Sequence, residues 1–267
     1  MAWSTSSGDT SVMSGEDILS KVPPPADARI VYGSDPHQFG DLRLPKGAKS
    51  PPLAIVIHGG FWRARYDLVH AGHLCAALTK AGIATWNLEY RRVGDSGGGW
   101  PGSLQDIAAA VRFLPRLAKH APIDARRLIA IGHSAGGHLA LTLAAHESAF
   151  NAVMALASVS DLRRAYDLHL SNDAVVEFLG GTPSQVPEHY SQASPMELKI
   201  TVPQAVIHGT HDDIVPVEMS RVYVEAKRKR GENVRLLELD CGHFELIDPS
   251  SHAWPAIQQA ALDLLKP

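Results

Sequence analysis

The sequence lacks the features that identify disulfide-rich, membrane-spanning and secreted proteins. It holds two cysteines, Cys75 and Cys241, which are too few and too far apart for a disulfide framework and fit a reducing compartment. No apolar run approaches the roughly 18 residues that a membrane helix needs. Residues 1–25 lack the basic start, apolar stretch and small-residue cleavage pattern of a signal peptide. We therefore expect a cytoplasmic protein with no membrane partner.

The sequence also has no large excess of positive or negative charge. The 25 Lys and Arg residues nearly balance the 28 Asp and Glu residues, and the net charge of −3 gives no reason to expect a nucleic acid partner. The basic run 227–230 falls at the end of a predicted helix, where positive charge suits the helix dipole. With 267 residues, of which 45% are hydrophobic, the chain is long enough for one well-filled core.

Residues 1–26 are small, polar and then proline-rich, and we interpret them as a poorly ordered N-terminal arm. Residues 27–267 alternate short apolar runs with helix-period segments, which is typical of a single α/β domain with a mostly parallel sheet and helices on both faces. About eight strands are expected, over residues 28–33, 39–44, 53–58, 83–90, 127–132, 152–158, 204–209 and 234–240. The first two are expected to pair antiparallel. Helices are expected over residues 68–81, 101–120, 135–146, 217–230 and 254–265.

One segment breaks this alternation. Residues 159 to about 200 hold several short polar and apolar pieces and no strand pattern. An insertion of this size between two sheet strands is usually functional. We expect a small lid over a site.

The clearest chemical motif is the pentapeptide from Gly132 to Gly136, with Ser134 at its centre. It follows an expected strand and precedes an expected helix, the context that a G-x-S-x-G nucleophile turn requires. The two glycines let the strand and helix backbones approach closely, and the tight turn lifts the serine hydroxyl above the sheet edge. We predict that Ser134 is a nucleophile.

A serine nucleophile needs a base that a third group holds in place. In this chain order the acid comes before the histidine, and both are expected after late strands. His243 follows the last expected strand and is the candidate base. Asp212 and Asp213 follow the preceding strand, and Asp161 follows the strand before that, so three acids are candidates.

The segment from His58 to Trp62 reads His-Gly-Gly-Phe-Trp after an expected strand, the pattern of a loop that donates backbone N–H groups to an oxyanion. We expect donors from Gly60 and Phe61, with the Ala135 N–H as their partner; Gly59 is an alternative. His58 is expected to brace the loop. Phe61 and Trp62 are candidates to line a substrate pocket or to pack under the lid.

No cofactor or metal is implied, because the serine machinery supplies the whole mechanism. The pair His208 and His211 straddles a strand end and has no further ligand nearby in sequence, so we assign both residues structural roles. Residues 94–99 are glycine-rich but lack the Gly-Lys-Ser/Thr ending of a phosphate loop. Cys241 has no nucleophile turn of its own.

These motifs resemble the α/β-hydrolase superfamily, in its esterase and lipase branch, over nearly the whole chain from about Arg29. The stretches HGGFW and GHSAGGHLA look like the kynurenine formamidase-like and small carboxylesterase group. HGTHDDIVP resembles that group's acid loop and maps the acid to Asp212, and GHFELID maps the base to His243. Two departures from hormone-sensitive-lipase-like esterases are Phe61, in place of a third glycine, and His133, in place of an acid before the serine.

The resemblance implies an α/β-hydrolase fold and a serine hydrolase that cleaves carboxylic esters of small-molecule acyl substrates through an acyl-enzyme. Two alternatives use the same machinery: an arylformamidase of the N-formylkynurenine type and an aminopeptidase-like acyl hydrolase. A third is a non-catalytic, ligand-binding use of the fold. Fold and triad do not fix acyl preference or oligomeric state.

Overall fold

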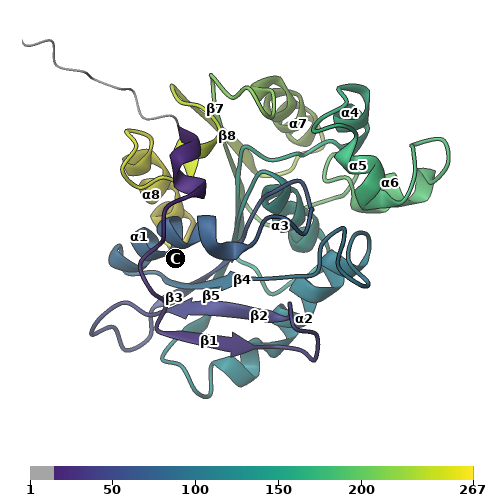
Figure 1. Cartoon of the computed structure of the whole chain (residues 1–267). Helices are drawn as coiled ribbons and strands as arrows, with labels where there is room; N and C mark the ends of the chain where they lie inside the picture. Colours follow the sequence, from purple (N-terminus) through teal and green to yellow (C-terminus); the bar gives the residue numbers. More distant parts are fainter. Residues whose placement is uncertain (1–14, 267) are drawn as a thin grey trace, which may run out of the picture.

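The computed structural model describes residues 15–266, and Figure 1 shows one sheet with helices on both sides. The sheet has eight strands in the order β1-β2-β4-β3-β5-β6-β7-β8. Their bounds are Ala28–Val31 (β1), Phe39–Arg43 (β2), Pro52–Ile57 (β3), Ala84–Leu88 (β4), Asp124–His133 (β5), Ala152–Leu156 (β6), Gln204–Gly209 (β7) and Val234–Leu239 (β8). β2 pairs antiparallel with both β1 and β4, and every other pair is parallel. The predicted fold class is confirmed.

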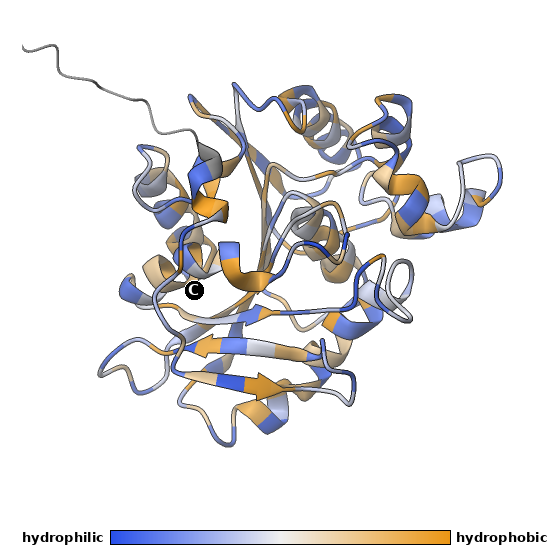
Figure 2. Cartoon of the chain, in the orientation of Figure 1, coloured by the Kyte–Doolittle hydropathy of each residue, from blue (hydrophilic) through white to orange (hydrophobic). Residues whose placement is uncertain are grey.

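Helices cover both faces of the sheet, because alternate side chains of each buried strand point to opposite sides. The core on one face includes side chains of α1 (Gly72–Lys80) and α8 (Trp254–Leu264). The other face packs against α2 (Gly102–Leu117), α3 (Ala135–His146) and α7 (Val217–Lys229). Figure 2 shows that the outer helices carry both hydrophilic and hydrophobic residues, as amphipathic covering helices do.

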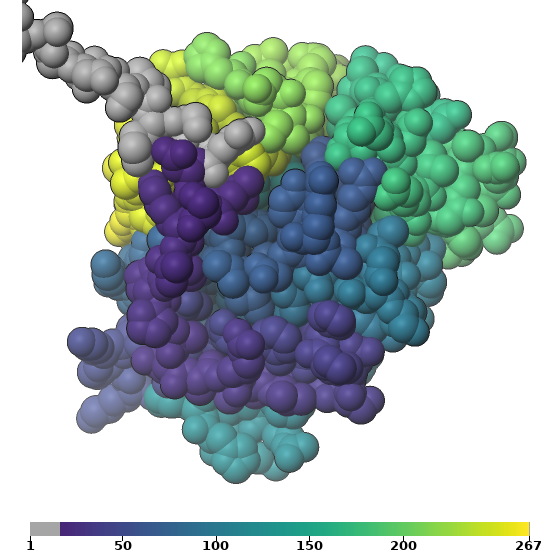
Figure 3. Space-filling view, viewed as in Figure 1, coloured from purple at the N-terminus to yellow at the C-terminus, as the bar shows by residue number. Residues whose placement is uncertain are grey.

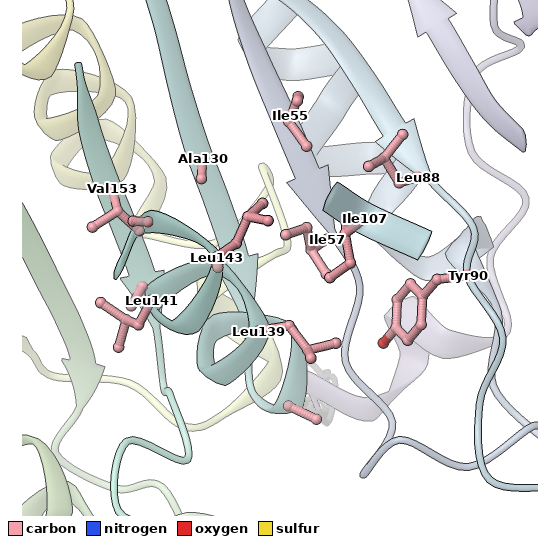
Figure 4. Close-up of a cluster of buried hydrophobic side chains, with 14 of the residues drawn as sticks. Ile55, Ile57, Leu88, Tyr90, Ile107, Ala130, Leu139, Leu141, Leu143 and Val153 are labelled. Carbon is pink, nitrogen blue, oxygen red and sulfur yellow. The ribbon is translucent and has the colours of Figure 1, made fainter. Parts of the chain in front are cut away.

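The central helix α3 is buried almost all round. In Figure 4, Leu139, Leu141 and Leu143 of this helix lie among side chains of the neighbouring strands, including Ile57 and Val153. All five of these side chains are inaccessible to solvent. Burial of each leucine contributes roughly 1.5–3 kcal/mol, so α3 holds its first turn in a fixed place above the sheet.

The expected lid segment forms three short helices between β6 and β7: α4 (Leu162–Asp167), α5 (Ala174–Leu179) and α6 (Pro187–Ala193). They project beyond the sheet at the upper right of Figure 1. The expected helix over residues 68–81 is divided into the 3₁₀ turn η2 (Leu68–Ala71) and α1. Two further 3₁₀ turns are η1 (Gly15–Leu19) and η3 (Phe244–Leu246).

Residues 1–14 of the predicted N-terminal arm lie outside the described residues. Within residues 15–26, Ile18 anchors the chain to the domain, because its side chain is 1% exposed and joins the core beneath α1 and α8. Poor order of the arm as a whole stays a prediction. Figure 3 shows this purple segment lying against the yellow C-terminal part of the surface.

Candidate active site

Ser134 lies at the turn between β5 and α3. Its φ of 56° and ψ of −123° are dihedrals that residues with a side chain rarely adopt. A Cβ added at Gly132 would lie 2.1 Å from the carbonyl oxygen of Gly136, and one added at Gly136 would lie 2.1 Å from that of Ile57. Only glycine therefore fits at either position, and the turn holds the serine at the carboxyl ends of the strands.

His243 and Asp212 come together at the same sheet edge, after β8 and β7. His243 Nδ1 lies 2.7 Å from Oδ2 of Asp212. Because a carboxylate only accepts, Nδ1 carries the proton and Nε2 is left as the acceptor. The other carboxylate oxygen accepts the N–H groups of Ile214 at 2.9 Å and Val215 at 2.8 Å. The Asp212 side chain is completely buried, and His243 is 4% exposed.

A second histidine contacts the same carboxylate. His208 is fully buried, and its Nε2 lies 3.1 Å from Asp212 Oδ2 and 2.8 Å from the Val215 carbonyl oxygen. Its Nδ1 lies 2.7 Å from the Ser220 hydroxyl. Sequence reasoning assigned His208 a structural role and missed this contact. The available signal was its position near the carboxyl end of the strand, four residues before Asp212.

These contacts set the charge of Asp212. Burial alone would raise its pKa, but the hydrogen bonds from His208, His243 and the Val215 backbone outweigh burial and hold the pKa below its usual range. The carboxyl group is therefore ionised at neutral pH and can stabilise a positive charge on His243.

The two other candidate acids lie elsewhere. Asp213 is exposed at the cavity rim. Asp161 caps α4, where its Oδ1 accepts the N–H groups of Arg163 at 3.0 Å and Arg164 at 3.1 Å. Of the three acids, Asp212 is the one that contacts His243.

The loop after β3 turns back towards Ser134. Gly60, Phe61 and Trp62 have φ values of 108°, 48° and 59°, which belong to the left-handed region. Within residues 15–266, the N–H groups of Gly60, Phe61 and Ala135 donate no hydrogen bond to the protein. Ala135 begins α3, where the first N–H groups have no partner inside the helix. Within the same residues the N–H group of Gly59 likewise donates no hydrogen bond, so the loop after β3 and the start of α3 both offer unpaired donors near the serine. The choice between Gly59 and Phe61 stays a prediction.

His58 braces this loop, as expected. Its Nδ1 lies 2.8 Å from the Gly59 carbonyl oxygen, and its Nε2 lies 3.0 Å from Oε1 of Glu89. The Tyr90 hydroxyl donates to the carbonyl oxygen of His58 at 2.8 Å. All these groups are buried, so the loop is held by polar contacts that water cannot easily replace.

Of the two positions predicted for Trp62, the structure shows the second, because Trp62 packs under the segment 159–200 and does not line the cavity. Trp62 is 1% exposed and stacks on Phe178 of α5, with ring centroids 4.6 Å apart. Its Nε1 donates to Nδ1 of His138 in α3 at 3.2 Å. The left-handed backbone turns the indole under the lid, and the preceding side chain, Phe61, lines the cavity instead.

Arg63 connects the same loop to the expected lid segment. Its guanidinium donates to both carboxylate oxygens of Glu177, at 2.8 and 3.1 Å, and to the Ser171 hydroxyl at 2.9 Å. The Arg63 side chain is 18% exposed, so this bidentate pair is partly shielded from water. The lid and the loop after β3 are therefore connected directly.

Ser134 and His243 open onto one cavity of about 330 Å³. Glycine and apolar or aromatic side chains form part of its wall, and polar side chains the remainder. The other lining residues are Leu19, Gly60, Phe61, Arg65, Tyr66, His70, His133, Ser171, Asp213, Ile214 and Phe244. This volume suits a small organic molecule.

Other expectations concern metals, cysteine and membranes. No cluster of three or more His, Cys, Asp or Glu side chains between residues 15 and 266 is arranged to hold a metal ion. Burial raises the pKa of the Cys241 thiol to about 12, so it is protonated at neutral pH and is a poor nucleophile.

Among residues 15–266, no helix combines the length and apolar character needed to span a membrane. The cytoplasmic location and the lack of a cofactor stay predictions.

The family profile named BD-FAE matches residues 41–226, from β2 to α7. This span is well over half of the chain and contains Ser134 and Asp212. The chain belongs to the BD-FAE family.

Two curated relatives of this BD-FAE family member carry esterase names. Esterase LipC of Mycobacterium tuberculosis is 27% identical over 254 residues, which are 84% of this chain and 62% of that protein. A probable isoprenylcysteine alpha-carbonyl methylesterase, ICME, of Oryza sativa subsp. japonica is 24% identical over 231 residues, 78% of this chain and 55% of that protein. The BD-FAE chain thus spans only a little over half the length of these relatives.

Solved structures support the fold. A truncated carbohydrate esterase from gut microbiota superposes with a TM-score of 0.79 at 21% identity, covering 92% of this chain and 99% of its own. Esterase B from Lactobacillus rhamnosis gives a TM-score of 0.77 at 18% identity, covering 94% and 89%. These likenesses show that the BD-FAE chain has the α/β-hydrolase fold. The narrower resemblance to kynurenine formamidase-like proteins stays a prediction.

Three buried histidines near the site make the stability of this BD-FAE protein depend on pH. Burial lowers the pKa of His70 and His138 to about 3, and burial next to His243 lowers that of His133 well below its usual value. Unfolded histidine titrates near pH 6.5, so in the acid range the unfolded chain binds protons that the folded protein does not. Stability is therefore highest above about pH 6.5 and falls as the pH drops towards 3.

His138 gives a direct test. Between pH 7 and pH 5 this residue alone is expected to lower the free energy of unfolding by about 2 kcal/mol. In His138→Leu, urea unfolding at the two pH values should show a pH effect smaller by that amount. Thr142→Val is the matched control, because Thr142 donates to the same carbonyl oxygen, that of Ala193, but does not titrate. An unaltered pH effect in His138→Leu would contradict the prediction.

Proposed function

We propose that the protein is a serine hydrolase that cleaves carboxylic esters of small-molecule acyl substrates. One observation carries the proposal: His243, whose Nδ1 lies 2.7 Å from the buried carboxylate of Asp212, opens onto the same cavity as Ser134, which stands at a strained turn before a buried helix. A serine, a histidine and an ionised carboxylate in this relation form the arrangement that activates a hydroxyl group.

The proposed reaction has two halves. In the first, Ser134 Oγ attacks the ester carbonyl carbon while Nε2 of His243 takes the hydroxyl proton. The tetrahedral intermediate collapses, His243 returns the proton to the leaving alcohol, and an acyl-enzyme forms. In the second half, His243 removes a proton from water, which attacks the acyl carbon. His243 then returns the proton to the departing Ser134 Oγ, and the carboxylic acid is released. Asp212 stays ionised and stabilises the imidazolium in both halves.

The negative oxygen that develops in each intermediate needs donors. We assign this role to the free N–H groups of Gly60, Phe61 and Ala135. They belong to rigid backbone, so they need no reorganisation when the charge forms. Loss of one such donor typically costs about 3 kcal/mol of transition-state stabilisation.

The relatives support ester substrates over the alternatives. LipC and ICME are both named as esterases, and the family match contains the serine and the acid. We therefore place ester hydrolysis ahead of arylformamide or peptide hydrolysis and ahead of a non-catalytic role.

The test combines a covalent probe with a substrate panel. We expect a fluorophosphonate to label the folded protein once, on the peptide that contains Ser134, and p-nitrophenyl esters from acetate to decanoate to be hydrolysed with a preference for short acyl groups. Hydrolysis of N-formylkynurenine or of a dipeptidyl chromogenic substrate without any ester hydrolysis would favour the alternative reactions. An unlabelled serine together with no hydrolysis would favour a ligand-binding role.

A further inference from the structure

A histidine outside the proposed triad also faces the cavity. His70 belongs to η2, and its side chain lines the cavity that holds Ser134 and His243. The residue is 6% exposed. Within residues 15–266 the Asp67 backbone is the one hydrogen-bonding group that acts on its ring, so one ring nitrogen stays free. Nδ1 of His133 is fully buried and has no hydrogen-bond partner, whereas neither ring nitrogen of His70 is in that situation. The cavity is therefore where a partner for His70 would bind.

The ring is held in place before any ligand arrives. It packs edge-on against His58, with centroids 5.6 Å apart and planes at 87°. The η2 backbone is fixed on both sides: the Leu68 N–H donates to Oε2 of Glu89 at 3.2 Å, and the Leu68 carbonyl oxygen accepts the Asn87 side-chain amide at 2.8 Å. A preorganised polar group in a cavity binds a complementary ligand group at little entropic cost.

His70 is also uncharged at ordinary pH. Burial lowers its pKa to about 3, nearby His58 lowers the pKa further, and Glu89 and the Asp67 backbone raise it only in part. A neutral imidazole has one N–H donor and one nitrogen acceptor. It therefore suits an uncharged hydrogen-bonding group better than it suits an anion, for which it would have to become protonated in a buried place.

We propose that His70 is a substrate-binding residue that selects esters carrying a hydroxyl group beside the scissile bond. This inference rests on the proposed ester hydrolysis. A substrate hydroxyl that reaches His70 gives the free ring nitrogen a hydrogen-bond partner, whereas a methyl group in the same place leaves that nitrogen unpaired and displaces water from it. Sites built around a buried polar group discriminate strongly against analogues that lack its partner.

The test uses two pairs of nearly isosteric esters. One pair differs in the alcohol part, 2-hydroxyethyl butyrate against propyl butyrate, and the other in the acyl part, ethyl 3-hydroxypropanoate against ethyl butyrate. Each kcat/KM value is divided by the rate of hydroxide-catalysed hydrolysis of the same ester, which removes intrinsic reactivity. For the wild-type protein we expect the hydroxylated ester to be preferred in at least one pair by about 10-fold or more.

Three variants identify the group responsible. His70→Phe should reduce that preference to within about 2-fold, mainly through a higher KM for the hydroxylated ester, while His70→Gln, which keeps an uncharged donor and acceptor, should retain part of it. His73→Phe is the matched control. His73 lies one turn further along, next to the Lys21 carbonyl oxygen and away from this cavity, so its variant should keep the full preference.

The outcomes separate this inference from the proposed function. If the wild-type protein hydrolyses all four esters without preference in either pair, or if the preference survives in His70→Phe, the role of His70 is overturned while ester hydrolysis stands. If it hydrolyses none of the four, the proposed function itself fails. Because the ring stays neutral, the preference should also be constant between pH 5.5 and 8.5, and a preference that disappears within that range contradicts an uncharged contact.

Discussion

Ser134→Ala should lose ester hydrolysis by a factor of about 10⁴ or more in kcat, with little change in KM for short esters. The reason is that the variant keeps the cavity and the N–H donors but has no atom that forms the acyl-enzyme. Residual turnover then comes from water attacking an ester that the donors still polarise. Stopped assays with p-nitrophenyl butyrate, and the absence of a fluorophosphonate adduct, measure both parts of the prediction.

The variant should fold normally. Alanine keeps the Cβ that Ser134 already carries at its strained φ of 56°, so no new clash arises at the turn. Thermal unfolding within a few degrees of the wild type would confirm this. Ser184→Ala, at an exposed position in the lid, is the control and should retain full activity. Activity of Ser134→Ala close to that of the wild type would rule out this serine as the nucleophile.

Features that depend on local pattern were predictable from the sequence. The central strands of the sheet show as short apolar runs, and the turn at Ser134 shows as two glycines at fixed spacing between a strand and a helix. The carboxyl ends of parallel strands share one edge, so residues that follow strands, such as Asp212 and His243, could be placed near one another from topology alone. The eight strands and their helices follow that prediction.

Features that depend on contacts between distant segments were not predictable. The sequence left two positions open for Trp62, and its stacking on Phe178, more than a hundred residues later in the chain, decides between them. Neither the link from Arg63 to Glu177 nor the burial of Ile18 shows as a motif. Such packing is decided by tertiary structure, which overrides what a single stretch of sequence indicates.

The second prediction with a large expected effect compares the two adjacent acids, Asp212 and Asp213. Asp212→Asn should lower kcat by about 10⁴, because an amide in that place no longer stabilises the imidazolium and favours the wrong tautomer of His243. The amide oxygen can still accept the N–H groups of Ile214 and Val215, so the loop should keep its shape. The sequence offers the matched control directly: Asp213→Asn removes the same charge one residue away, at an exposed site.

For Asp213→Asn we expect a change in kcat of less than about tenfold, since an exposed charge is screened by water and salt. The pH profile of kcat/KM provides a second measurement. In the wild-type protein the pKa of Asp212 is held below its usual range, so the carboxylate stays ionised across the working pH and its protonation does not limit the rate. Equal losses in the two variants would show that overall negative charge near the cavity matters. A large loss in Asp212→Asn alone would show that the contact with His243 is what the reaction requires.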